Sequence, residues 1–491
     1  MAEPHVTGSA TEHTLHRQLT GRQLTMIGLG GAIGTGLFLG SGLAISQAGP
    51  ATIIAFVVVA LVALVIAWAL AEMVTVHPNS GAFGTIAHSY LGHWAGFIIR
   101  WTYWTIQVIA VGGEVIAAGI YVQYWWPSIP LWLAVVGFSV ALIAVNAATV
   151  RFFGEFEYWL SMIKVSAIVA FILLGILLIT VGLPDAPATG LHNLTSDGGF
   201  SPMGLSGIFL AMVFVVFSFI GTEVVSVTAA ESENPTRDIP RAARQMVLRL
   251  ALFYVLAIAV VLTIAPWSQT AKGGSLDASP FVRVLEAAHV PGGASLMNFV
   301  ILTAALSSAN TNLYLTTRMM HSLAGHGYAP ALFGRLSKSG APRNALVLST
   351  IGLAIAAALS VQEGNSAYVA LFGISVFGAL VVWMMILASH ARFRLLRARH
   401  GLPDSPARLW GAPITTGLAF LFLGAVLVST AFIDGLQIAW KVGTPFFLLL
   451  LVAYFLTARR GSSASNDPLR DELTARSEHD ASPDSAVGSG T

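Results

Sequence analysis

The stretch that decides the fold is GLGGAIGTGLFLG, which occupies residues 28–40. It lies within an apolar run from about 24 to 47, long enough to cross a bilayer as one helix. Six of its thirteen residues are glycine, and a glycine inside a helix costs about 1 kcal/mol relative to alanine. Unwound backbone at membrane depth is tolerated only where it lines a cavity or is buried in protein. The stretch therefore predicts a membrane helix that is interrupted near its middle.

A second stretch, FSFIGTE at residues 217–223, repeats this pattern. Both stretches contain Ile-Gly-Thr, at 33–35 and at 220–222, an offset of 187 residues. Paired interruptions in corresponding membrane helices indicate a secondary transporter built from inverted repeats. The alternative is that the glycines serve only close helix packing.

The composition excludes several classes of protein. Hydrophobic residues make up 55% of the 491 residues and charged residues only 10%, whereas soluble domains contain about 25% charged residues. An ordinary soluble enzyme, a disordered chain and a nucleic-acid binder are therefore excluded. The net charge of +2 indicates no polyanionic partner. The absence of cysteine excludes disulfides and thiolate metal sites. The remaining class is an all-α polytopic membrane protein.

We predict twelve transmembrane helices, because the apolar runs are continuous and do not alternate as barrel strands do. The first five form one repeat over about 24–182, the next five form a second over about 204–391, and the last two follow over about 412–458. Together they make a transporter domain at 21–458, with disordered tails at 1–20 and 459–491. The predicted spans are 24–47, 51–76, 94–125, 130–148, 156–182, 204–230, 246–266, 292–324, 345–361, 366–391, 412–433 and 437–458.

The basic residues predict the orientation. With the N-terminus inside, 19 of the 25 lysines and arginines fall on inner segments, three on outer segments and three within spans. Cytoplasmic loops carry such an excess of Lys and Arg. We therefore expect both termini in the cytoplasm and a location in the plasma membrane. The alternative reading of these loops as lipid-binding patches explains the loop-by-loop alternation less well.

Four charged residues fall within or at the ends of apolar spans, where such residues are functional candidates. Lys164 lies about eight residues into the fifth span, where a lysine can release and take up a proton; its alternative role is a fixed structural cation. Glu114 follows two glycines near the midplane and is expected either to face the pocket or to pair with Lys164. Glu223 follows the second interruption, where capping of free N–H groups and a functional role are both open. Glu72 is expected to be structural.

The interruptions also suggest a ligand. A half-helix that begins at mid-membrane presents free N–H groups, which suit a carboxylate, and one that ends there presents free carbonyls, which suit an ammonium group or a cation. A site with both ends suits a zwitterion. Motifs for catalysis, for ATP binding and for a metal site are not evident in the sequence. Transport must then draw on an ion gradient or on exchange.

Together these motifs resemble those of the amino acid–polyamine–organocation superfamily, and within it the bacterial amino acid permease family. The resemblance covers about residues 20–458 and is strongest to the γ-aminobutyrate permease branch. It implies the five-plus-five inverted-repeat fold, also called the leucine-transporter fold, with helices 1 and 6 broken. The motifs are GGAIGTGLF at 30–38, NSGAF at 79–83, GEFEYW at 154–159, IKV at 163–165, FSFIGTE at 217–223, AESENP at 230–235, IPRA at 239–242 and LSSAN at 306–310.

The resemblance also implies the binding residues. Thr35 and Gly36 would hold the substrate carboxylate at the first interruption. The backbone carbonyls of Ala32, Phe217 and Ile220 would receive the ammonium group. The Phe217 ring would close the pocket as a gate.

A second group of residues is implied for coupling. Lys164 matches a lysine that takes the place of a sodium ion in proton-coupled relatives. Ser307 and Ser308 match the side of that site formed by the eighth helix. Glu114 matches an acidic position found in only part of the family.

We therefore predict a secondary active transporter, not an enzyme, that imports amino acids by proton symport. Its partners would be an amino acid, a proton and the lipid bilayer, and it would use no cofactor beyond the proton gradient. A neutral amino acid or γ-aminobutyrate is favoured as substrate. The alternatives are an exchanger of the same fold and a transport-dead amino acid receptor. The identity of the substrate and the oligomeric state are not readable from the sequence.

Overall fold

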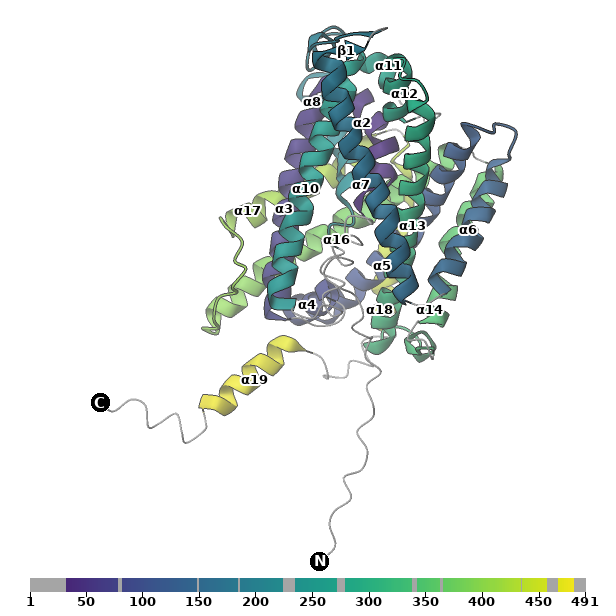
Figure 1. The fold of residues 1–491 in the computed structure, drawn as a ribbon. Coiled ribbons are helices and arrows are strands. Elements are labelled where there is room, and N and C mark those ends of the chain that lie inside the picture. Colours follow the sequence, from purple (N-terminus) through teal and green to yellow (C-terminus); the bar gives the residue numbers. More distant parts are fainter. Residues whose placement is uncertain are drawn as a thin grey trace, which may run out of the picture.

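The computed structural model describes the residue ranges 32–77, 82–147, 150–183, 186–223, 235–271, 279–337, 342–362, 365–433, 435–456 and 467–480. These residues form a bundle of long helices (Figure 1). The one sheet among them is a ribbon in which β1, Gly182–Leu183, pairs antiparallel with β2, Ala186–Pro187. Apolar runs adopt helices in a membrane because a helix satisfies its backbone polar groups internally.

The helices follow one another along the whole described chain. In chain order they are the π-helix η1 Gly36–Gly40, then α2 Ser41–Ala48, α3 Thr52–Val76, α4 Ala82–Leu91, α5 His93–Gln123, α6 Leu131–Ala147, α7 Val150–Thr180, α8 Gly204–Phe219, α10 Pro235–Ile264, α11 Trp267–Ala271, α12 Pro280–Ala287, α13 Gly293–Gly325, α14 Arg343–Ser349, α15 Ile351–Gln362, α16 Asn365–Arg399, α17 Ile414–Ser429, α18 Ile438–Leu456 and α19 Pro468–Asp480.

Many of these helices are apolar enough for a bilayer. Within the described ranges, eight helical segments are long and apolar enough to cross a membrane, and the apolar helices α6 and α8 are shorter. The predicted eighth span corresponds to α13, which is 33 residues long and carries many polar residues. The eight segments are Gly36–Val76, His93–Gln123, Phe152–Thr180, Arg241–Ile264, Arg343–Val361, Ser366–Arg399, Ile414–Phe432 and Ile438–Leu456.

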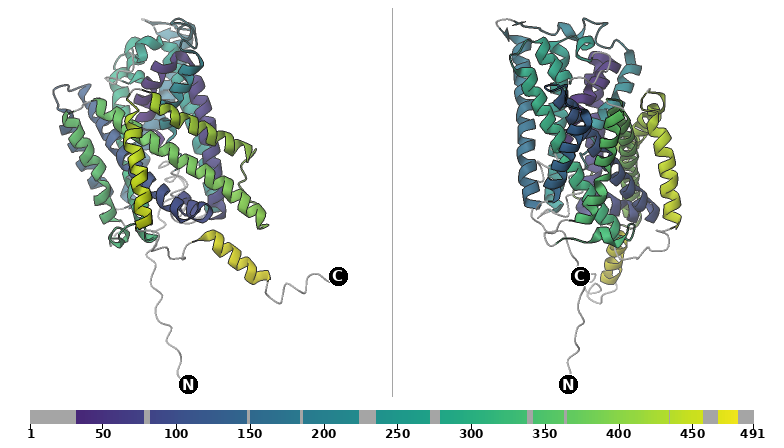
Figure 2. Two further views of the ribbon diagram at one scale, coloured as in Figure 1. Left: turned by 180° about the vertical axis from the view of Figure 1, so that it is seen from behind. Right: turned by 90° about the vertical axis from the view of Figure 1, so that its right-hand side faces the viewer.

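Helix α5 lies at the centre of the bundle. It packs against α13, α16, α4, α15 and α6, whereas α3 packs against α10 and α8. The most apolar part of α5 is 83% buried, whereas that of α18 is 17% buried. Figure 2 shows α18 along the outside of the bundle. Polar residues placed on α5 are therefore surrounded by protein.

Non-helical backbone occurs at both predicted interruptions. Residues 33 and 34 form a bend before η1 begins at Gly36. Helix α8 ends at Phe219, after which Ile220 is extended with φ −62° and ψ 137°. Gly221 then takes φ +101°, a conformation that favours glycine. The rest of each predicted broken helix, 24–31 and 224–230, lies outside the described residues.

The C-terminal tail contains an element that the sequence did not predict. We expected disorder over 459–491, but α19 is helical and docks beneath the bundle (Figure 2). Leu469 is buried, and the guanidinium of Arg397 donates to both carboxylate oxygens of Glu472, at 2.6 and 3.1 Å. Arg397 belongs to α16, and α19 also packs against α4, so the polar composition of the tail did not reveal its docking. The predicted N-terminal tail, 1–20, lies outside the described residues.

Candidate functional site

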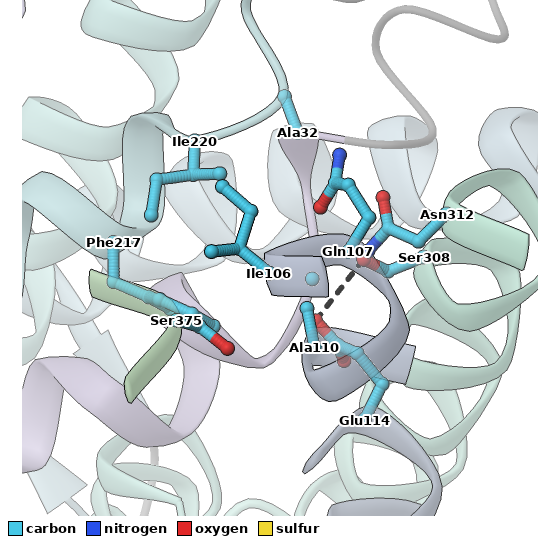
Figure 3. Close-up of a pocket in the computed structure, with 12 residues that line it drawn as sticks. Ala32, Ile106, Gln107, Ala110, Glu114, Phe217, Ile220, Ser308, Asn312 and Ser375 are labelled. Atoms are coloured by element: carbon cyan, nitrogen blue, oxygen red, sulfur yellow. Dashed lines mark hydrogen bonds between the residues drawn. The ribbon is translucent and has the colours of Figure 1, made fainter. Parts of the chain in front are cut away.

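A cavity lies where the two interruptions meet α5, α13 and α16 (Figure 3). Its volume is about 20 Å³, room for about one water molecule, so the protein is nearly closed around the site in this conformation. Six of the nine residues predicted for the site line it. The full lining is Ala32, Gly34, Gly36, Ile106, Gln107, Ala110, Glu114, Phe217, Ile220, Ser308, Asn312 and Ser375.

The first interruption presents a helix start to this cavity. The backbone N–H of Thr35, just before η1, points to the carboxylate of Glu114, with N···O distances of 3.3 and 3.2 Å. Free N–H groups at a helix start favour an anion. The Thr35 hydroxyl accepts a hydrogen bond from the Tyr368 hydroxyl at 3.2 Å. The position predicted for a substrate carboxylate therefore holds a carboxylate of the protein itself.

Two glycines let the surrounding groups approach this helix start. A Cβ on Gly34 would lie 2.5 Å from an oxygen of Glu114 and 2.6 Å from Oγ of Ser308. A Cβ on Gly36 would lie 2.8 Å from the ring of Phe217 and 2.9 Å from Cα of Ser218. All four distances are shorter than 3.0 Å, the limit below which a Cβ atom is essentially never found. Glycine at these positions is thus required for the two interruptions and Glu114 to meet.

The second interruption presents a helix end. The carbonyl of Phe217 accepts the N–H of Ile220 at 3.2 Å, and the carbonyl of Ala32 accepts the Tyr254 hydroxyl at 2.8 Å. Two of the three carbonyls predicted for an ammonium group thus have a protein donor already. A carbonyl oxygen has two lone pairs, so each can accept a second hydrogen bond. The Phe217 ring packs on Phe372 with centroids 4.3 Å apart.

Lys164 reaches the first interruption from α7. It is fully buried, and its Nζ donates to the carbonyl of Ile33 at 3.0 Å. That carbonyl belongs to the bend before η1 and is not part of a regular helix. A lysine ammonium therefore lies where the unwound backbone offers a carbonyl to a cation.

The two serines of α13 bind different carboxylates. Ser308 donates to Glu114 at 3.0 Å, and Ser307 donates to Glu157. Glu157 is fully buried and also accepts from Asn310 Nδ2 at 3.0 Å and from Ser161 Oγ at 3.2 Å. Glu157 was not among the site residues predicted from the sequence. Glu157 lies seven residues before Lys164, which is two helical turns. This spacing indicates that both residues share one face of α7 and could have pointed to Glu157.

The other two acidic candidates have structural partners. Glu223 accepts the N–H of Gly221 at 3.2 and 3.1 Å and the indole N–H of Trp383 at 3.3 Å. Glu72 is bound by Arg394 through two hydrogen bonds of 2.9 Å and by His390 at 3.1 Å. Glu223 therefore caps the second interruption, and Glu72 joins α3 to α16.

A small polar cavity at interrupted membrane helices is the arrangement of a transport protein. The amino acid permease family model matches residues 23–465, and the chain belongs to that family. The family assignment confirms the resemblance found in the sequence. It also confirms an amino acid transporter, and a multi-pass membrane protein, as the class of the chain.

Several known proteins align with this chain over nearly their whole lengths. A γ-aminobutyric acid permease of Bacillus subtilis (strain 168) is 38% identical over 446 residues, which cover 91% of this chain and 94% of the relative. The amino-acid permease AapA of the same organism is 38% identical over 452 residues, 92% and 96% of the two chains. The aromatic amino acid transport protein AroP of Escherichia coli (strain K12) is 36% identical over 441 residues, 90% and 95%. These relatives are named as permeases or transport proteins and not as enzymes.

Proposed function

We propose that this permease imports a neutral amino acid or γ-aminobutyrate across the plasma membrane together with a proton, with both termini in the cytoplasm. The observation that carries the proposal is the hydrogen bond from Lys164 Nζ to the Ile33 carbonyl, 3.0 Å long and fully buried. It connects a titratable group to the backbone of the substrate cavity. Protonation of Lys164 and the conformation of the first interruption are then linked.

Substrate binding would use both interruptions. The substrate carboxylate would take the N–H groups at Thr35 and Gly36, and its ammonium group would take the free lone pairs of the Ala32, Phe217 and Ile220 carbonyls. Glu114 would leave the Thr35 N–H when the substrate enters. In this account Glu114 occupies the carboxylate position of the empty site, and Phe217 closes over the filled one.

Coupling would follow from the charge on Lys164. The ammonium form donates a charge-assisted hydrogen bond to Ile33, which is about twice as strong as that of a neutral amine. Loss of the proton on the inner side would weaken this contact and free the first interruption to move. Ser307 and Ser308 hold the two nearby carboxylates from α13 and so keep the site polar without a metal or cofactor.

The lining supports an uncharged substrate side chain. Apart from Glu114, the described residues around the cavity are uncharged, and the polar ones are Gln107, Ser308, Asn312 and Ser375. A basic side chain would need a dedicated carboxylate and an acidic one a basic partner. The cavity, about 20 Å³ in this conformation, must widen to admit any substrate, and an uncharged side chain requires no further charged partner when it does.

The proposed architecture is the five-plus-five inverted repeat with α17 and α18 outside it. Contact between η1 and α8 supports this pairing, because each borders the interruption of its own repeat. The peripheral position of α18 also supports it, since a helix outside the repeats is expected to cover little of the site. We also propose that the chain crosses the membrane twelve times.

The test is uptake of labelled γ-aminobutyrate and neutral amino acids into proteoliposomes with acid outside. We expect accumulation that collapses when the gradient is dissipated, and its loss in Lys164→Ala. Lys441→Ala, which removes an exposed lysine, is the matched control. Uptake that ignores the gradient would overturn symport, and uptake that requires luminal substrate would favour an exchanger. Binding without flux would favour a receptor.

A further inference from the structure

Helices α7 and α13 pack along each other (Figure 1). On the inner side of Lys164 they bury a row of polar side chains. On α7, Lys164 is followed toward the helix start by Ser161, Glu157 and Phe153, at intervals that place them on one face. On α13 the facing residues are Ser307, Asn310, Tyr314 and Arg318. We refer to these eight residues as the inner seam.

Glu157 is the charged centre of the seam. It is fully buried and receives hydrogen bonds from three neutral side chains, those of Ser161, Ser307 and Asn310. A carboxylate at this depth in a membrane protein is costly and marks a pathway for ions or protons more often than a purely structural contact. Nothing in the proposed binding of the substrate uses this group.

The charges around Glu157 leave room for a proton. Lys164 on its own helix is the charge that acts on Glu157, and Lys164 is also attracted by Glu114 on α5. On α13, Arg318 lies over the ring of Tyr314. If Glu157, Glu114 and Lys164 are all ionised, two carboxylates lie near one ammonium group. The low-dielectric interior then holds a net charge of about −1. Such a charge is relieved when one carboxylate takes up a proton.

The hydrogen bonds continue from Glu157 toward the end of α6. Asn310 donates to Glu157 through Nδ2 at 3.0 Å and accepts from Asn146 Nδ2 through Oδ1 at 2.8 Å. Asn146 is only partly buried, one residue before α6 ends. The hydrogen bonds therefore join the buried carboxylate to a partly buried amide near the end of α6.

Aromatic rings cover Glu157 one helical turn further inward. Phe153 and Tyr314 are buried and stack face to face, with centroids 4.2 Å apart and planes 5° apart. Arg318 is a half-buried residue, and its guanidinium carbon lies 3.3 Å from the centre of the Tyr314 ring. The two stacked rings therefore separate the Glu157 carboxylate from water on the cytoplasmic side until α7 and α13 move apart.

We propose that Glu157 is the proton acceptor through which Lys164 discharges to the cytoplasm. The N–H bond of the Lys164 ammonium breaks and an O–H bond forms on Glu157, which leaves a neutral amine and a neutral carboxylic acid. When the Phe153–Tyr314 stack parts, the carboxylic O–H gives its proton to inner water and the carboxylate is restored. This inference rests on the proposed proton symport.

The test compares Glu157→Gln with Glu155→Gln in the full-length protein in proteoliposomes. Glu155 lies two residues away on the exposed side of α7. We expect Glu157→Gln to exchange labelled for unlabelled substrate nearly as wild type does at equal pH, because the amide can still accept from Ser307. Accumulation driven by the pH gradient should fall about 100-fold, the range for loss of a proton-transfer group. Glu155→Gln should retain both activities.

Gradient-driven accumulation by Glu157→Gln at the wild-type rate would overturn the inference. If wild type itself ignores the gradient, the proposed symport fails instead, so the two failures are distinguishable.

If Glu157→Gln also loses substrate exchange, a second measurement tests whether Glu157 carries protons. Phe153→Ala opens the stack and should raise the proton leak of substrate-free vesicles, and adding Glu157→Gln to it should remove that leak. A leak that persists in the double variant would show that protons bypass Glu157.

Discussion

The carboxylate of Glu114 lies against the backbone N–H of Thr35, with its two oxygens 3.3 and 3.2 Å from that nitrogen. The two residues are 79 positions apart and belong to α5 and to the first interruption. A helix start that suits a carboxylate is thus occupied by an internal one, which an incoming amino acid has to displace.

Replacement of Glu114 by glutamine should therefore tighten substrate binding. A neutral amide holds the Thr35 N–H less strongly than a carboxylate does, by about 1 kcal/mol, or about fivefold in the dissociation constant. Equilibrium binding of labelled substrate to purified Glu114→Gln measures this change, with Glu155→Gln as control. Weaker binding by Glu114→Gln would indicate that Glu114 instead receives the substrate ammonium group.

A methyl group on Gly36 should abolish transport. Its Cβ would lie 2.9 Å from Cα of Ser218, so backbone must move and the two interruptions must separate. Gly137, on α6, provides the matched control, because no described atom lies within 4 Å of the place that a Cβ would take there. We expect uptake to be lost in Gly36→Ala and kept in Gly137→Ala, whose helix should gain about 0.5–1 kcal/mol. Normal uptake by Gly36→Ala would contradict the proposed meeting of the interruptions.

Gly352 should be needed for stability. A Cβ there would lie 2.0 Å from the backbone carbonyl oxygen of Val108, which brings α15 against the central helix α5. Gly352→Ala should destabilise the protein by about 1–3 kcal/mol, as overpacking does, and lower its melting temperature in detergent. Gly417→Ala, whose Cβ would have no atom of the described chain within 4 Å, should leave the melting temperature close to that of wild type. Equal melting temperatures for the two variants would show that the helices separate without cost.

Acid should destabilise the end of α13. Burial, with the charge of Arg100 as a further cause, lowers the pKa of His326 to about 3 from its ordinary 6.5. The neutral ring accepts from Arg100 Nη2 at 3.1 Å. Because the folded state binds the proton less readily than the unfolded chain, stability is full above pH 6.5 and falls as the pH drops toward 3.

Thermal unfolding between about pH 7 and about pH 4.5 measures this effect. We expect wild type to lose about 2–3 kcal/mol from this histidine, and His326→Gln to show a flatter pH dependence. His192, which is exposed, provides the control substitution His192→Gln. An unchanged pH dependence in His326→Gln would exclude this residue as the cause.

The positions of the helices and interruptions could be predicted because they depend on local composition. Glycines at 28–40 and at 217–223 weaken a helix wherever it packs, and non-helical backbone is found at Gly34 and at Ile220. The resemblance to permeases predicted further site residues such as Phe217, which lines the cavity. Burial of Lys164 also follows from its position within an apolar run.

The partners of the polar residues could not be predicted in the same way. Ser307 and Ser308 are adjacent in sequence but bind different carboxylates, because successive residues of a helix point about 100° apart. Which group each one meets depends on the rotation of α13 against α5 and α7. The docking of α19 likewise depends on Arg397, which is remote in sequence from Glu472.

The central claim is that an amino acid and a proton cross together through the site at the two interruptions. The most direct test uses proteoliposomes that enclose a pH-sensitive dye, with equal pH on both sides and the membrane potential held at zero. We expect the lumen to acidify when the best-transported amino acid is added outside to wild type, and not when it is added to Lys164→Ala. Entry of the amino acid into wild-type vesicles at constant luminal pH would contradict the claim.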